Sequence, residues 1–157
     1  MSQENLELAR GLFEAFRTAP ETVGYDAAID LLDDAPLDTK VEWDPRAVAE
    51  TFGVLDIDQV YVGIEGGKAF WREWLSAWEA VTVDYELVDA GNHVVALLEQ
   101  QMKGRSTGIE VQLGRYAQVF TFRDGLLTRW KCYAKPEDAL KAVGLSVVGD
   151  ATPRSSS

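Results

Sequence analysis

The stretch "VEWDPR", residues 41–46, ends an alternating apolar strand on Asp44, directly before Pro45. Because proline lacks a backbone donor and keeps the preceding residue extended, Asp44 should be held at the strand end with little freedom. If Trp43 and an aromatic wall desolvate this carboxylate, its pKa rises toward neutrality, which suits a general base. The alternative is a solvated turn acid paired with Arg46, and the sequence leaves both interpretations open.

Two uncharged amides fall on strand faces that are otherwise apolar. Alternation along residues 93–103 and 109–122 gives each strand one inward-facing set. These sets are Ala96, Leu98, Gln100 and Met102 in the first strand, and Tyr116, Gln118, Phe120 and Phe122 in the second. Since buried amides need partners, Gln100 and Gln118 either bond to each other or to the backbone, or they line a cavity and orient a ligand.

Tyrosines and further aromatic residues complete the candidate site. With Asp44 as base and Gln118 as an orienting group, Tyr61 or Tyr116 could donate to a developing oxyanion. Cys132 is interpreted as a small core residue, because no histidine stands near it in a motif that would activate the thiol. The expected ligand-binding residues are Trp43, Trp74, Gln100, Tyr116, Phe120, Trp130 and Cys132.

Helices of different strength should position these residues. Apolar residues at helical spacing predict an amphipathic helix from Ser2 that ends at Pro20, and residues 25–34 predict a shorter helix capped by Asp26. Residues 68–78 form a strong aromatic helix. The preceding "GIEGG" is interpreted as the turn that starts this helix, because the spacing and the missing Ser/Thr after the lysine do not fit a phosphate loop.

The strands are predicted by a period of two. Short strands are expected at Val41–Trp43 and at residues 59–62, and a loop at residues 45–59 separates them. A four-stranded antiparallel meander follows, over residues 81–89, 93–103, 109–122 and 126–134, and a short helix over residues 136–145 comes last. This order predicts one α+β domain over residues 1–146, with helices on one face of the sheet, and a flexible tail over residues 147–157.

Composition excludes several classes of protein. The chain has 157 residues, of which 46% are hydrophobic, and its net charge of −11 disfavours binding to nucleic acid or to an anionic membrane. One cysteine and one histidine exclude an internal disulfide and a structural zinc site of the usual kind. We expect no metal site and no cofactor. Without a signal pattern or an apolar run of about 20 residues, a cytoplasmic location is expected.

The outer face of the predicted sheet carries an apolar patch formed by Leu97, Val119 and Tyr133. Patches of this kind are usually covered in the native protein. We therefore expect a homodimer that pairs through this face.

The order of elements resembles the nuclear-transport-factor-two-like superfamily, and within it the SnoaL-like branch. The resemblance covers roughly Asn5 to Leu145. It rests on "LARGLFEAF", "DAAIDLLDD", "VEWDPR", "YVGIEGGKAFWREWL" and "YAQVFTFRDGLLTRWKCY". It implies a cone, in which a curved antiparallel sheet wraps about three N-terminal and central helices as an α+β barrel, with a pocket at the open end.

The resemblance also implies a set of reactions. Relatives include ketosteroid isomerases, polyketide cyclases, dehydratases and epoxide hydrolases. Carried over from the isomerases, the first-helix tyrosine falls near Leu12 and the oxyanion aspartic acid falls at Gln118. The aspartate base falls at Trp43 or at Asp44, because this chain has one extra residue before the proline.

Three functions remain open. The first is acid/base catalysis in an aromatic pocket on a polycyclic or terpenoid-like substrate, of the isomerase, cyclase, dehydratase or hydrolase type. The second is non-catalytic binding of a small apolar molecule. The third is a dimeric interaction module whose core is closed by side chains.

Overall fold

The first helix is longer than the sequence predicts. The computed structural model describes residues 2–22, 29–47, 59–76, 78–104 and 107–145. Helix α1 (Ser2–Thr22) continues past Pro20, so the predicted end was wrong by two residues. A proline mainly constrains the residues before it, so the final residues can keep helical angles. Asp26, the predicted cap of the second helix, lies outside the described residues, and of that helix the structure gives residues 29–30 and the short 3-10 helix η1 (Leu31–Asp34).

Six strands form one curved sheet in the order β2-β1-β6-β5-β4-β3. Their bounds are β1 (Leu37–Asp44), β2 (Tyr61–Val62), β3 (Trp78–Ala90), β4 (His93–Gly104), β5 (Glu110–Arg123) and β6 (Leu126–Tyr133). The antiparallel meander β3 to β6 is confirmed. However, β1 pairs with β6 in parallel, so the sheet is mixed, and β2 and β3 are its two edges, so it does not close into a barrel. Alternation in β1 identifies its buried face but not the direction of its neighbour.

Helix α4 (Gly63–Ser76) includes the glycines that we expected to precede it. Of the three glycines in the segment "GIEGG", only Gly63 has the positive φ of a turn residue, at 83°. Gly67 lies inside the helix, where a Cβ atom would come within 2.4 Å of the indole nitrogen of Trp43. This glycine therefore permits close packing of α4 on β1, and the interpretation of the whole segment as a turn was wrong.

The lysine of this segment makes a structural ion pair. Lys68 is 8% exposed, and its ammonium group donates to both carboxylate oxygens of Asp33 at 3.0 and 3.1 Å. These bonds raise the pKa of Lys68 and tie α4 to η1. A lysine committed in this way agrees with the interpretation that the segment is not a phosphate loop.

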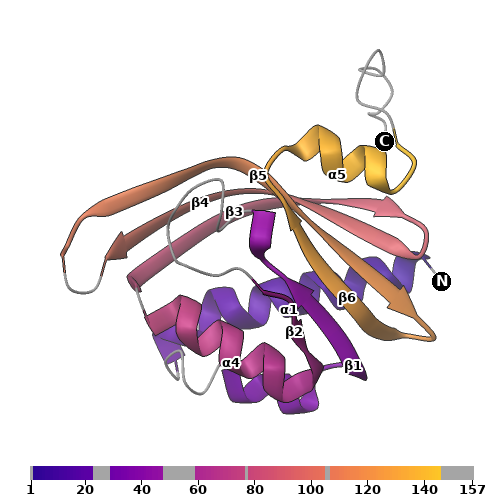
Figure 1. Cartoon of the computed structure of the whole chain (residues 1–157), viewed down its shortest axis with the longest axis horizontal. Coiled ribbons are helices and arrows are strands. Elements are labelled where there is room, and N and C mark those ends of the chain that lie inside the picture. Colours follow the sequence, from indigo (N-terminus) through magenta and orange to yellow (C-terminus); the bar gives the residue numbers. More distant parts are fainter. Residues whose placement is uncertain (1, 23–28, 48–58, 77, 105–106, 146–157) are drawn as a thin grey trace.

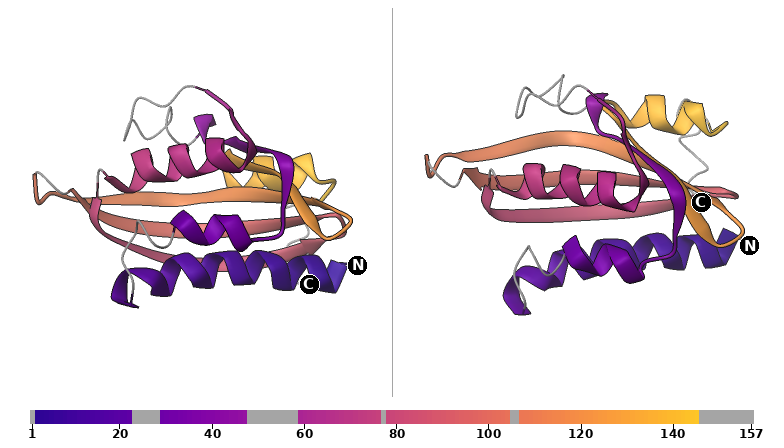
Figure 2. Two further views of the ribbon diagram at one scale, coloured as in Figure 1. Left: turned by 90° about the horizontal axis from the view of Figure 1, so that it is seen from below. Right: turned by 60° about the horizontal axis from the view of Figure 1, so that its bottom comes forward.

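The helices lie on both sides of the sheet. Helices α1 and α4 occupy one side, which we call the inner face, and the short helix α5 (Pro136–Ala142) lies on the other, the outer face (Figure 1). The two further views in Figure 2 show the same layers. The inward-facing sets predicted for β4 and β5 are confirmed, because all eight side chains are buried. Within the described ranges, no helix is both long and apolar enough to cross a membrane.

Helix α5 changes the interpretation of the outer face. Val119 is only 5% exposed within the single chain, and it belongs to a second apolar cluster with Val95, Ala117 and Ala139 of α5. Leu97 and Tyr133 pack against the same cluster. The chain thus covers much of this patch with its own helix. The homodimer stays a prediction, but an uncovered patch no longer supports it.

Candidate functional site

Aromatic rings from three elements meet on the inner face. The ring of Trp130 on β6 lies 6.0 Å from that of Trp43 on β1, 5.6 Å from that of Phe70 and 5.2 Å from that of Trp71, both on α4. Trp74 joins them through Phe70, at 6.4 Å. Tilted and edge-on ring pairs of this kind add stability beyond the apolar area that they bury. We call these five residues the aromatic wall.

Strand register and helix packing explain why the wall forms. Trp43 and Trp130 are register partners in the parallel pair β1–β6, so their side chains leave the sheet on the same face. The indole nitrogen of Trp43 also donates to the backbone oxygen of Gly63 at 3.1 Å, which anchors the ring against the start of α4.

The two predicted amides lie beside this wall, and each has a side-chain partner. Gln118 is 6% exposed, and its Oε1 accepts a hydrogen bond from the indole of Trp130 at 3.0 Å. Gln100 is 5% exposed, and its Oε1 accepts a hydrogen bond from the hydroxyl of Tyr116 at 2.5 Å. Among the described residues, the two amide oxygens thus bond to aromatic side chains, and not to the other amide or to the backbone, which was the alternative that the sequence left open.

The two pairs are neighbours, because Gln118 and Tyr116 lie two residues apart on the same face of β5. Burial raises the pKa of Tyr116, and the amide of Gln118 opposes part of that rise. At the far end, Nε2 of Gln100 donates to the thioether sulfur of Met102 at 3.3 Å. The five residues Trp130, Gln118, Tyr116, Gln100 and Met102 therefore lie side by side as one buried group across β6, β5 and β4, which we call the polar chain.

The acidic candidate, Asp44, is buried but firmly paired. Its side chain is 4% exposed, and the guanidinium of Arg46 donates to both carboxylate oxygens, at 2.8 and 2.9 Å. The backbone amide of Arg46 donates as well, at 3.2 Å. Although burial raises the pKa of Asp44, these bonds outweigh it and hold that pKa below its usual value. The predicted raised pKa was wrong, because the sequence does not show the conformation of Arg46.

Register places Asp44 at the edge of the candidate site. Its partner on β6 is Lys131, whereas Cys132, the next residue, is the register partner of Gln118. Burial raises the pKa of the Cys132 thiol well above its usual value, and the negative charge of Asp44 raises it further. Cys132 is therefore a protonated, buried side chain at neutral pH, as expected for a core residue.

Tyr61 and Phe120 stand apart from the polar chain. Tyr61 is half-buried, and its hydroxyl donates to the carboxylate of Glu73 at 3.1 Å, so the proposed oxyanion donor is directed to α4. Phe120 is buried, and its ring lies 5.5 Å from that of Phe13 on α1. Phe13 in turn stacks on Tyr85 at 4.5 Å, so Phe120 belongs to the packing between α1 and the sheet.

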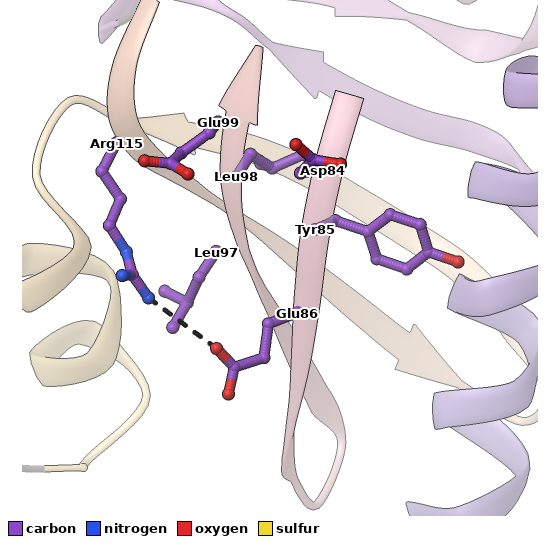
Figure 3. Close-up of a pocket in the computed structure, with 7 residues that line it drawn as sticks. All are labelled: Asp84, Tyr85, Glu86, Leu97, Leu98, Glu99 and Arg115. Atoms are coloured by element: carbon purple, nitrogen blue, oxygen red, sulfur yellow. Dashed lines mark ion pairs between the residues drawn. The ribbon is translucent and has the colours of Figure 1, made fainter. Parts of the chain in front are cut away.

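A shallow depression of about 190 Å³ lies on β3, β4 and β5. Figure 3 shows Glu86, Leu97 and Arg115 on one side of the sheet, with Arg115 reaching Glu86, while the ring of Tyr85 points the other way, toward the helices. The two charged groups are 3.8 Å apart and largely exposed. This depression is separate from the polar chain, and none of the predicted site residues lines it.

The structure thus gathers most of the predicted site. Six of the predicted residues lie in the aromatic wall or the polar chain: Trp43, Trp74, Gln100, Tyr116, Gln118 and Trp130. Asp44 and Cys132 lie at the edge. The ring of Tyr61 contacts the wall through Phe70, at 5.5 Å, but its hydroxyl is directed to Glu73, and Phe120 packs against α1 instead. Sequence analysis placed Met102 inward but gave it no role, and it named the pairing of Asp44 with Arg46 only as the alternative to a raised pKa. The signal for Met102 was the alternation along its strand, and the signal for Arg46 was its position two residues after Asp44.

Known structures share this fold at low identity. An NTF2-like protein of unknown function from Burkholderia pseudomallei is 17% identical, with a TM-score of 0.64 over 90% of this chain and 98% of that chain. TerC, crystallised with polyporic acid, is 19% identical, with a TM-score of 0.63 over 89% and 98%. A SnoaL-like protein from Jannaschia, described as a putative polyketide cyclase, is 17% identical, with a TM-score of 0.62 over 83% and 85%.

Family comparison gives the more direct result. No curated protein matches the chain significantly. The family model of the SnoaL-like domain matches residues 37–130, which span the wall and the polar chain from β1 to Trp130. The chain therefore belongs to the SnoaL-like domain family, as its sequence resemblance predicted.

Proposed function

We propose that the protein binds a small apolar molecule on the inner face of its sheet. The aromatic wall would supply contact area, and the polar chain would orient the ligand. The observation that carries this proposal is the presence of Gln100, Tyr116 and Gln118 on a face that otherwise packs apolar groups. Apolar residues of similar size would avoid the desolvation of these polar groups, so stability alone gives no reason for them.

The protonation states favour an uncharged ligand. Burial raises the pKa of Tyr116, and it raises the pKa of Cys132, so both stay protonated near neutral pH. The charge of Asp44 at the edge is already paired with Arg46. A ligand that carries its own net charge would gain no buried counter-ion from the polar chain. The co-crystallisation of TerC with polyporic acid supports an organic ligand within this fold.

Tryptophan emission tests the binding proposal. Planar polycyclic compounds that enter the site should change the emission, because Trp43 and Trp130 belong to the wall. The variant Gln118→Leu should weaken this response, whereas Gln112→Leu, an exposed position on the same strand, should leave it unchanged. No response across a panel of such compounds would contradict binding and favour the interaction module with a closed core.

Acid/base catalysis by Asp44 is a second candidate. Its support is a buried carboxylate that is ionised at neutral pH and adjacent in sequence to Trp43 of the wall. Arg46 would have to release this carboxylate before it accepts a proton, and Gln118 would orient the substrate. The reaction would be of the isomerase, cyclase, dehydratase or hydrolase type on a polycyclic or terpenoid-like substrate.

The change Asp44→Asn separates the two candidates. It keeps the side-chain volume, so ligand binding should be nearly unchanged. If Asp44 is the base, turnover of a substrate should fall about a hundredfold or more. Equal turnover by the wild type and the variant would contradict the catalytic role and leave binding intact.

A further inference from the structure

The hydrogen bonds of the polar chain run in one direction. The indole nitrogen of Trp130 can only donate, so the amide oxygen of Gln118 must face it, as the 3.0 Å contact shows. This fixes the orientation of the amide, and its NH₂ group points away from the indole. Gln118 therefore continues the series as a donor.

Tyr116 keeps the same order of donor and acceptor. Its single hydroxyl proton is used in the 2.5 Å bond to Oε1 of Gln100, so toward the neighbouring Gln118 amide the phenol oxygen can act only as an acceptor. Both amide oxygens are thus satisfied, that of Gln118 by Trp130 and that of Gln100 by Tyr116. The amide NH₂ of Gln100 is the donor that remains at the end.

The acceptor at this end is the weakest of the series. Nε2 of Gln100 donates to the sulfur of Met102 at 3.3 Å, and a thioether accepts hydrogen bonds poorly compared with oxygen. Both residues are buried, at 5% and 2% exposure, so water does not supply a better partner. Met102 also has a flexible side chain that can take another rotamer.

Met102 lies close to one end of the sheet. It stands two residues before Gly104, the last residue of β4. In Figures 1 and 2 the ends of β4 and β5 extend beyond α1 and α4.

From this direction we infer that the site takes an uncharged ligand with an acceptor oxygen, such as a ketone, quinone or ether, which receives the Gln100 amide hydrogen in place of the Met102 sulfur. The inference rests on the proposed binding function and names its ligand class. A carboxylate would have to lose its hydration without meeting a cation in the polar chain, so anions should be rejected.

Three probes with the same ring skeleton test the ligand class by tryptophan emission. Fluorenone carries a carbonyl oxygen, fluorene lacks it, and fluorene-9-carboxylate carries a charge. Fluorenone should bind about threefold to tenfold more tightly than fluorene, the usual effect of one neutral hydrogen bond, and the carboxylate should bind most weakly. Equal affinity for fluorenone and fluorene would overturn this inference while the proposed function stands; no binding by any probe would overturn both.

Variants of neighbouring residues assign the effect to one donor. Gln100→Leu should abolish the preference for fluorenone, whereas Gln101→Leu, an exposed control, should keep it. Met102→Leu removes the competing acceptor at similar volume, so it should increase the affinity for fluorenone and not for fluorene. An unchanged preference in folded Gln100→Leu would overturn the inference, and if this variant does not fold, the Met102→Leu result decides in the same way.

Discussion

Strands β4 to β6 bury side chains on both of their faces, but the buried groups differ in kind. On the outer face, Val95, Ala117 and Val119 pack under Ala139 of α5 as an apolar cluster. On the inner face, the polar chain runs among aromatic rings and ends on the sulfur of Met102. One face is thus complete as it stands, and the other holds a donor whose partner is weak.

This difference suggests separate roles for the two faces: the outer face stabilises the fold, and the inner face also recognises the ligand. Covering the apolar cluster of the outer face requires only apolar area, which a seven-residue helix supplies. The inner face keeps polar groups that cost free energy to bury, and they are arranged in one direction. Changes on the outer face should therefore alter stability and not ligand preference, whereas changes in the polar chain should alter preference as well.

The largest expected effect comes from the outer face. Ala139→Asp places a carboxylate where the native side chain is fully buried, so we expect the free energy of unfolding to fall by about 3 kcal/mol. Ala142→Asp, at an exposed position of the same helix, should cost under about 1 kcal/mol. Urea denaturation gives both values. If Ala139→Asp lost the fluorenone preference while still folded, the separation of the two faces would be wrong.

A smaller effect is expected where α4 packs on β1. Gly67→Ala adds a Cβ atom 2.4 Å from the Trp43 indole nitrogen, and that ring is anchored by its bond to Gly63, so overpacking should cost about 2 kcal/mol. Gly11→Ala in α1 meets nothing within 4 Å and should instead stabilise by up to about 1 kcal/mol through helix propensity. Thermal or urea unfolding distinguishes the opposite signs. Stabilisation by both changes would show that α4 does not need this close approach.

The smallest effect concerns Arg46 and depends on pH. Because the pKa of Asp44 is lowered in the folded state, the pair contributes stability above the ordinary aspartate pKa and loses it as pH falls. Arg46 is half-exposed, so Arg46→Met should cost only about 1 kcal/mol at pH 7, and this difference from the wild type should shrink below about pH 4.

Arg129→Met is the matched control for that change. Arg129 and Glu42 form a looser pair at 3.9 Å between half-exposed side chains, so its loss should cost under about 0.5 kcal/mol at any of these pH values. A cost of Arg46→Met that stayed constant from pH 7 to pH 3 would contradict the assigned ionisation of Asp44.

Patterns of period two predicted the inner face well. The alternation of β4 and β5 placed Gln100 and Gln118 inward, because a residue's face is fixed by the pleat of its own strand. Contacts between elements far apart in the sequence could not be predicted from these patterns. The seven residues of α5 carry no signal for the face that they cover, and the parallel pairing of β1 with β6 depends on the path of the whole chain.

Side-chain conformation marks the other limit of the sequence. Pairing of Asp44 with Arg46 was one of two interpretations, and only the geometry shows that both carboxylate oxygens are taken. Likewise, the spacing of the glycines before Lys68 did not show that Trp43 occupies the space beside Gly67. In both cases the outcome depended on which partner a side chain contacts and which rotamer it adopts, and residue type alone does not show either.

The most direct test of ligand binding on the inner face is to follow side-chain amide signals by NMR during a fluorenone titration. The account predicts that the NH₂ signals of Gln100 and Gln118 and the indole signal of Trp130 shift together, because the polar chain connects them. The signals of Gln101 and Gln112, which are exposed, should stay in place. Shifts confined to Gln101 and Gln112, or no shifts at saturating fluorenone, would contradict it.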